Sequence, residues 1–143
     1  MATFLVKTEP TTYSFADLVK AKKCTWDGVT SNAALAALRT IRKGDTVLVY
    51  HTGDEKAIVA LAAAASDPYE DPKQPGLTAK GEPKFAVIDL KPISAAPIPL
   101  TLAAIKADAR FKSFPLVTQG RLSVMPVPEP LDALIRTLTH LHK

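Results

Sequence analysis

Cysteine is nearly absent from the sequence. Cys24 is the only cysteine among the 143 residues, so an internal disulfide is excluded, as is a zinc site built on several thiolates. Histidine is also scarce: the three present are His51, His140 and His142. The last two would point to different faces of a C-terminal helix. We therefore expect neither a metal nor another cofactor.

Glycine is too scattered to form a phosphate-binding loop. The six glycines match neither G-x-G-x-x-G nor G-x-x-x-x-G-K-[ST], and no G-x-S-x-G nucleophile motif occurs. Cys24 and His51 could pair as nucleophile and base, but a cysteine beside Trp26 more often packs as a small apolar residue. The carboxylate pairs at 54–55 and 70–71 lie in expected turns. The sequence therefore gives no support for an enzyme.

Long hydrophobic runs are missing as well. A helix that spans a bilayer needs about 20 apolar residues, and the longest run of small apolar residues covers only 57–65. Residues 1–6 lack the pattern of an export signal. Because 47% of the residues are hydrophobic, the chain is too apolar for disorder. We expect one domain over residues 1–143, cytoplasmic, without a membrane partner and monomeric by default.

The net charge of the chain is also small. The chain has 18 Lys+Arg and 14 Asp+Glu, a net charge of +4, which permits a nucleic-acid partner without requiring one. The densest basic groups, residues 20–23 and 39–43, fall at the ends of expected helices, where cations favour the helix dipole. Charge alone therefore names no partner.

Apolar patterns predict short strands through the middle of the chain. Strand-like segments cover residues 3–8, 45–51, 58–65, 84–91 and 120–125, and for the alanine-rich segment 58–65 a helix is the alternative. The continuous apolar run at 45–51 favours a strand buried on both faces. Pro92, Pro97 and Pro99 confine the segment after residue 91 to an edge strand or an extended stretch. Pro126 is expected to end the last strand.

Short helices are expected between and after these strands. They begin at Ser14, with Asp17 completing a capping box, cover 33–43 up to Gly44, start again at the cap Thr101, and close the chain over 131–141. Residues 67–83 are rich in Pro and Gly and predict a long irregular loop. The pattern is α+β, a small curved sheet or barrel decorated by short helices.

Six groups of short strings occur in the order found in one known family. They are Leu5-Val6-Lys7-Thr8-Glu9-Pro10 with Tyr13-Ser14 and Asp17-Leu18; Trp26-Asp27-Gly28-Val29-Thr30-Ser31; Gly44-Asp45 with Tyr50-His51-Thr52-Gly53; Asp67-Pro68-Tyr69 with Asp71-Pro72; Val87-Ile88-Asp89-Leu90; and Arg121-Leu122-Ser123-Val124-Met125-Pro126-Val127. From residue 3 to about 138 the chain resembles the EVE domain, a PUA-like domain related to the YTH domain. That resemblance implies a small, strongly curved β-barrel surrounded by helices.

The resemblance implies a binding module for a modified base of DNA or RNA, flipped out into an aromatic-lined pocket. Small members of this kind are found in bacteria, where the family is linked to base-modification and restriction systems. Base stacking on an aromatic side chain contributes about 1–3 kcal/mol. Trp26 is the only tryptophan and is the expected stacking platform. The alternative is a tryptophan that only fills the core.

The polar candidates come from three further segments. Lys7 and Thr8 match the family's Lys-Ser dipeptide at the end of the first strand; they would contact a phosphate and the base edge, or else form an ordinary strand end. After the indole come Val29, Thr30, Ser31 and Asn32. If Ser31 or Asn32 caps the next helix, its free N–H groups suit an anion or a carbonyl. Plain capping is the alternative.

Two pairs complete the candidate site. Tyr50 and His51 end the buried strand and would lie at the barrel mouth, as a second wall and a hydrogen-bond donor. The alternative is a core tyrosine with a structural histidine. Arg121 and Ser123 lie two apart on the expected last strand and would face the same way. Arg121 would clamp a phosphate or carbonyl, or else pair with a carboxylate, Asp27 or Asp89.

Several functions therefore stay open at the level of sequence. The leading hypothesis is a reader of a modified nucleobase in DNA or RNA. A pocket for a free nucleoside or another small molecule is the first alternative. An enzyme acting through Cys24 or His51 and a protein-interaction module using the loop at 67–83 are the others.

Overall fold

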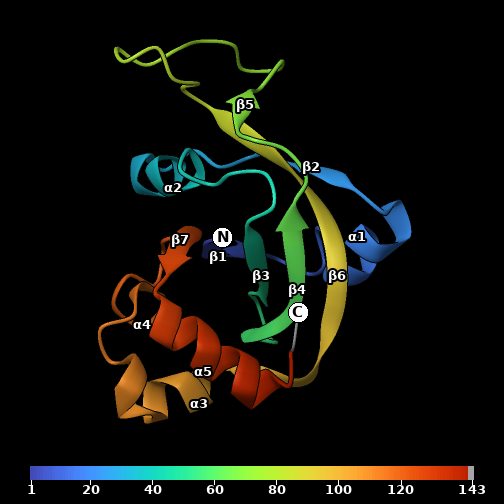
Figure 1. Cartoon of the computed structure of the whole chain (residues 1–143), viewed down its shortest axis with the longest axis vertical. Helices are drawn as coiled ribbons and strands as arrows, with labels where there is room; N and C mark the ends of the chain where they lie inside the picture. Colours follow the sequence, from blue (N-terminus) through green and yellow to red (C-terminus); the bar gives the residue numbers. More distant parts are fainter. Residues whose placement is uncertain (142–143) are drawn as a thin grey trace.

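A curled mixed sheet forms the frame of the structure (Figure 1). The computed structural model describes residues 1–141, and within them the sheet has seven strands in the order β2-β6-β4-β3-β1-β7, with β5 paired to β6. The strands are β1 (Thr3–Thr8), β2 (Cys24–Trp26), β3 (Thr46–His51), β4 (Ala57–Ala64), β5 (Tyr69–Glu70), β6 (Ala86–Thr101) and β7 (Val124–Val127). Strands β1 and β3 are parallel, and the other pairs are antiparallel.

Short helices surround this sheet. They are α1 (Phe15–Ala21), α2 (Asn32–Leu38), α3 (Leu102–Ala107), the 3-10 helix η1 (Ala109–Phe111), α4 (Pro115–Thr118) and α5 (Glu129–Thr139). Helices α1 and α5 contact β6, while α2 contacts β6 and β7. Figure 1 shows α1 and α5 at different sides of the long, bent β6. The α+β prediction, a small curved sheet decorated by short helices, is confirmed.

The alternation of side chains along β1 separates two hydrophobic cores. Phe4 and Val6 belong to the core that also holds Trp26, whereas Leu5 belongs to the core that holds Tyr50. Successive residues of a strand point to opposite faces. The last two residues of β1, Lys7 and Thr8, therefore leave the sheet toward different cores, and this decides which side of the site each one serves.

The local signals for element ends are largely confirmed. Ser14 and Asp17 form the capping box of α1, and the Thr101 hydroxyl accepts from the amide of Ala104 at the start of α3. Strand β3 is buried along its whole length, as its continuous apolar pattern predicts. No helix within residues 1–141 is long and apolar enough to cross a membrane.

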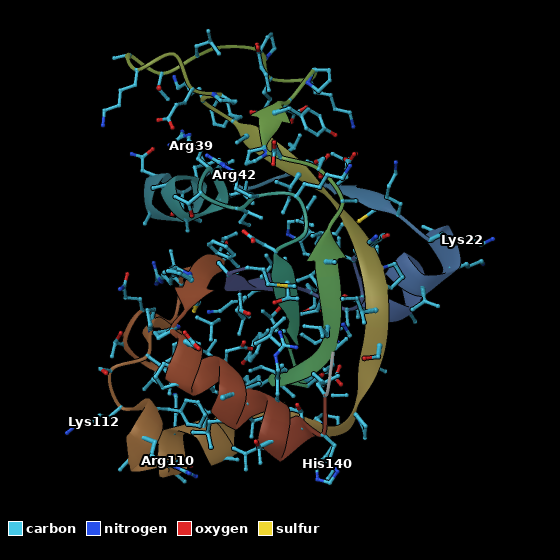
Figure 2. All side chains as sticks on the ribbon, viewed as in Figure 1. Lys22, Arg39, Arg42, Arg110, Lys112 and His140 are labelled. Atoms are coloured by element: carbon cyan, nitrogen blue, oxygen red, sulfur yellow. The ribbon has the colours of Figure 1, made fainter. Side chains whose placement is uncertain are left out.

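The second helix is shorter than predicted. It ends at Leu38 rather than at residue 43, because the next residues are used in side-chain contacts instead. Arg39 donates to the carbonyl oxygens of Pro83 and Lys84, each at 2.8 Å, and the Asp45 carboxylate accepts from the amide of Arg42 at 2.8 Å. These contacts form a turn into β3. Figure 2 shows Arg39 and Arg42 beside α2 on the side facing the long loop.

Prolines lie inside two strands, β6 and β7, and only the first case agrees with the prediction. Strand β6 continues through Pro92, Pro97 and Pro99, but beyond Leu90 it pairs only with β4, which agrees with the expected edge character. The last strand is Val124–Val127, so Pro126 lies inside it and does not end it. That proline is tolerated because β7 pairs with β1 alone. Residues 120–123 are a turn and extended chain rather than a strand.

Two further segments complete the comparison with the sequence. Residues 67–83 are mostly irregular, as expected, but contain β5 and a bridge between Leu77 and Pro83. Figure 1 shows this loop standing away from the rest of the chain. The helices η1 and α4, between residues 109 and 118, were not predicted. Phe111 and Phe114 in this region are buried in the core that holds Tyr50.

Candidate functional site

A cavity of about 670 Å³ opens at the end of β1, and we call it the Trp26 pocket. Its lining consists of Lys7, Thr8, Thr12, Tyr13, Cys24, Thr25, Trp26, Asp27, Gly28, Val29, Thr30, Ser31, Arg121 and Ser123. Most of the residues expected at the site therefore meet in one place. Asn32, Tyr50 and His51 are the expected residues that do not line it.

Trp26 combines the two interpretations that the sequence left open. Its strand, β2, pairs with β6 opposite Ile88, which fixes the indole at the edge of the core. The side chain is 8% exposed and packs in the hydrophobic cluster with Val29. It also lines the open cavity. The indole is therefore held rigidly by the core while a hollow remains beside it.

Tyr13 is a pocket residue that sequence reasoning did not select. Its ring lies edge-on to Trp26, with centroids 6.1 Å apart and planes at 80°. Its Oη is buried and has no hydrogen-bond partner among the residues that the structure describes, apart from a weak contact with the Cys24 thiol. Burial raises the pKa of Tyr13 to about 12, and the neighbouring Cys24 thiol adds to the rise. The signal in the sequence was the Tyr13-Ser14 string, which was used only for the resemblance.

Thr8 and Lys7 contribute differently to the pocket. The Thr8 hydroxyl donates to the carbonyl oxygen of Tyr13 at 2.7 Å, so its donor is used to hold the pocket wall. Lys7 Nζ donates to the carbonyl oxygen of Gly120 at 2.9 Å and lies 5.7 Å from the centroid of the Tyr50 ring. Partial burial lowers the pKa of Lys7. Lys7 therefore forms a border of the pocket rather than part of its floor.

Arg121 and Ser123 line the pocket as expected, but not as neighbours on a strand. They lie on a turn and its extended continuation, not on a strand. The amide of Lys7 donates to the Ser123 carbonyl at 3.0 Å and so ties this segment to β1. The alternative of an ion pair with Asp27 or Asp89 is wrong, because no ion pair of Arg121 occurs within residues 1–141. The Arg121 side chain is exposed.

The segment after Trp26 forms the opposite rim. Gly28 has φ +79°, a left-handed conformation that glycine adopts without strain. It turns the chain from β2 toward α2. The Ser31 hydroxyl accepts from the amide of Ala34 at 3.3 Å, so Ser31 is the cap and Asn32 begins the helix. Ser31 therefore both caps α2 and lines the pocket, while Asn32 lies outside.

Tyr50 and His51 are placed away from the Trp26 pocket. His51 is buried; its Nε2 accepts from the amide of Phe15 at 3.1 Å, and its Nδ1 lies 2.7 Å from Glu55 Oε1. Both ring nitrogens are thus used to hold α1 and the turn after β3. Tyr50 lines a separate hollow. The expectation that the two share a mouth with Trp26 fails because Tyr50 follows the alternation of β3 and faces the same core as Leu48, while the His51 ring is bonded to Phe15 and Glu55.

The catalytic and metal-binding alternatives gain no geometric support. His51 is not paired with Cys24, since its ring bonds to Phe15 and Glu55. Burial raises the pKa of the Cys24 thiol, which disfavours a thiolate. No group of three potential metal ligands is found within residues 1–141. His140 ends α5, and His142 lies outside the described residues.

The curled mixed sheet with short helices and a pocket at the end of β1 is a PUA-like α+β fold. The family model of the EVE domain matches residues 2–138, nearly the whole chain. The protein belongs to the EVE domain family, and the resemblance noted from the motifs is confirmed. No protein with a curated description matches the chain.

Solved structures share the fold over the full length. Rpa0253 from Rhodopseudomonas palustris is 33% identical, with 100% of this chain and 96% of that chain covered and a TM-score of 0.87. A hypothetical protein from Leishmania major is 31% identical, with 98% and 95% covered and a TM-score of 0.87. Human THYN1, solved in complex with 5-methylcytosine containing DNA, is 23% identical, with 100% of both chains covered and a TM-score of 0.86.

Proposed function

We propose that the protein binds a modified nucleobase of DNA or RNA in the Trp26 pocket, and that it acts by binding rather than by catalysis. The observation that carries this proposal is the Trp26 indole, which the hydrophobic core holds in place while it lines an open cavity.

The pocket suits a flat heteroaromatic ligand in size and chemistry. Its volume of about 670 Å³ falls in the range of about 300–1,000 Å³ common for small-molecule sites. An extruded base costs a few kcal/mol to unstack, and stacking on an aromatic side chain returns about 1–3 kcal/mol per base. Trp26 can supply such stacking. Donors and acceptors for a base edge come from Asp27, Thr30 and Ser123 at the lining.

The position of Arg121 favours a polynucleotide ligand over an isolated base. Its guanidinium is exposed at the rim of the pocket and has no ion-pair partner within residues 1–141. A guanidinium in this position can take a phosphate in a two-point contact. Human THYN1, which shares the fold, was solved with 5-methylcytosine containing DNA. That makes 5-methylcytosine the first modified base to test here.

Trp26 provides the direct test, because it is the only tryptophan and its fluorescence reports on the pocket alone. The protein is titrated with oligonucleotides of one sequence that carry cytosine, 5-methylcytosine or another modified base. We expect a preference for one modified base and an affinity that falls with salt, since phosphate contacts release counterions. Equal weak binding to every oligonucleotide would refute the proposal. Tight, salt-independent binding of the free nucleoside would favour the small-molecule alternative.

A further inference from the structure

A second, smaller hollow lies beside the Trp26 pocket, and we call it the lysine hollow. Its volume is about 220 Å³, and Lys7, Lys56 and Lys106 line it together with Tyr50. These cations come from β1, from the turn between β3 and β4, and from α3. The amide of Leu102 donates to the carbonyl oxygen of Lys56 at 2.8 Å. That hydrogen bond holds the start of α3 against the turn.

Shared lining residues connect the lysine hollow to the Trp26 pocket, both directly and through a third hollow. Lys7 lines both hollows. Gly120 lines the lysine hollow and also a third hollow of about 370 Å³, which Arg121 and Ser31 share with the Trp26 pocket. Residues 119–122 therefore stand among three adjoining hollows. A strand with its base in the Trp26 pocket could follow this path with its backbone.

The lining of the lysine hollow combines cationic and apolar residues. Three lysines belong to it, and no acidic residue does. Glu9 borders it beside Gly53, with its carboxylate bonded to Thr11.

The apolar part of the lysine hollow comes from α3 and α4. Leu102, Leu116 and Val117 contribute it. Tyr50, which also lines the hollow, is 3% exposed, and no hydrogen bond of its hydroxyl occurs within residues 1–141. The hollow thus offers cations and a hydroxyl donor over an apolar floor.

We propose that the lysine hollow binds the sugar–phosphate unit next to the base held in the Trp26 pocket. The phosphate is bound by Lys56 and Lys106, with Lys7 between the two hollows, and the sugar carbons lie on the apolar floor. An ammonium group is a point charge that binds a phosphate without a fixed orientation. This inference rests on the proposed function, because it takes the flipped base as the anchor of the strand.

The test compares charge-removing variants at matched positions. Lys56→Gln and Lys106→Gln each remove one exposed cation of the hollow. Lys22→Gln is the control: Lys22 and Lys56 both have positive φ, 69° and 46°, so in both variants the same change is made at a residue with positive φ. Figure 2 shows Lys22 at the outer side of the molecule, away from α3. Binding of a single-stranded oligonucleotide with the preferred base is measured over a range of salt concentrations.

We expect the slope of log K against log[salt] to become less steep by about 0.7 for each of Lys56→Gln and Lys106→Gln, and to stay unchanged for Lys22→Gln. Adding the flanking phosphates to the modified nucleoside should raise the affinity of the wild type and not that of the Lys56→Gln/Lys106→Gln double variant. Affinity for the free nucleoside should be the same in all variants.

Other outcomes separate this inference from the proposed function. Wild-type slopes in both hollow variants, with the preference for a modified base intact, would overturn the inference and leave the function standing. Flattened slopes without any base preference would refute the function and retain a phosphate site. Inorganic phosphate is the third probe: if it saturates the hollow while strand binding is unaffected, the hollow is a site for free phosphate and the strand path is wrong.

Discussion

The Tyr13 ring meets the Trp26 indole edge-on, at 6.1 Å between centroids and 80° between planes. Edge-on aromatic pairs contribute about 0.5–1.5 kcal/mol beyond the area that they bury, so the two rings fix one another. Tyr13 Oη is buried in the same place, with only a weak contact to the Cys24 thiol in the described part of the chain. Packing at this position is therefore tight, whereas the hydroxyl lacks a strong hydrogen bond.

Tyr13→Phe should separate the folding role of this residue from its binding role. Loss of an unsatisfied buried hydroxyl should raise the free energy of unfolding by about 1 kcal/mol. Because the hydroxyl is buried away from the cavity surface, its loss should change binding of the preferred modified base by no more than about twofold. Urea denaturation and Trp26 fluorescence titration measure the two effects.

Tyr69→Phe is the matched control for that substitution. Tyr69 Oη donates to Asp89 Oδ1 at 2.7 Å, and Tyr69 does not line the Trp26 pocket. Its variant should lose stability and keep the affinity. If Tyr13→Phe binds much more weakly than the wild type and Tyr69→Phe does not, the Tyr13 hydroxyl becomes accessible on binding and is a donor to the ligand rather than only part of the pocket wall.

Tyr13 should also be visible in alkaline titration. Its pKa in the folded protein is raised from 10.0 to about 12, so the unfolded chain loses this proton first as the pH rises. The stability contributed by the neutral phenol is complete below pH 10 and is lost as the pH rises from 10 to about 12. The absorbance difference between wild type and Tyr13→Phe should show a tyrosinate that forms near pH 12. A tyrosinate that forms near pH 10 would contradict the buried environment.

The structural features that could be predicted from the sequence are those that depend on residues a few positions apart. The capping box of Ser14 and Asp17, the cap at Thr101 and the end of β1 at Thr8 all follow from residues a few positions apart. The short α2 shows the limit of such signals. Its expected last turn, up to Gly44, is replaced by contacts of Arg39 with Pro83 and of the Arg42 amide with Asp45, and the first of these involves a distant loop.

The candidate site shows the same division. Trp26 with Val29–Ser31 could be predicted because one continuous segment carries them. The position of Tyr50 outside the pocket could not, because it depends on which of the two cores each face of β3 meets. The unsatisfied hydroxyl of Tyr13 depends on what surrounds it in three dimensions. No spacing of residues in a sequence reports such an absence.

His51 should prove to be a stabilising residue and not a ligand of the Trp26 pocket. In His51→Ala the buried amide of Phe15 loses its acceptor, at 3.1 Å in the wild type, which should cost about 1–3 kcal/mol. Binding of the modified base, measured where the variant is folded, should stay within about twofold. Glu55→Gln keeps an acceptor for Nδ1 and should be milder. A stable His51→Ala protein that no longer binds would return His51 to the list of site residues.

Gly53→Ala should destabilise the turn that borders the lysine hollow. Gly53 has φ +76°, and a Cβ there would overlap the carboxylate of Glu9. An alanine would have to adopt a left-handed backbone conformation, and its Cβ would displace the Glu9 carboxylate. Together these two effects should lower the free energy of unfolding by at least about 1 kcal/mol. Gly120→Ala, in the other turn of the same hollow, is the control. Its φ is not in that region and nothing lies within 4 Å of an added Cβ, so its urea midpoint should match or exceed that of the wild type. Equal losses in both variants would show that the Glu9 contact and the φ of Gly53 are not what holds this turn.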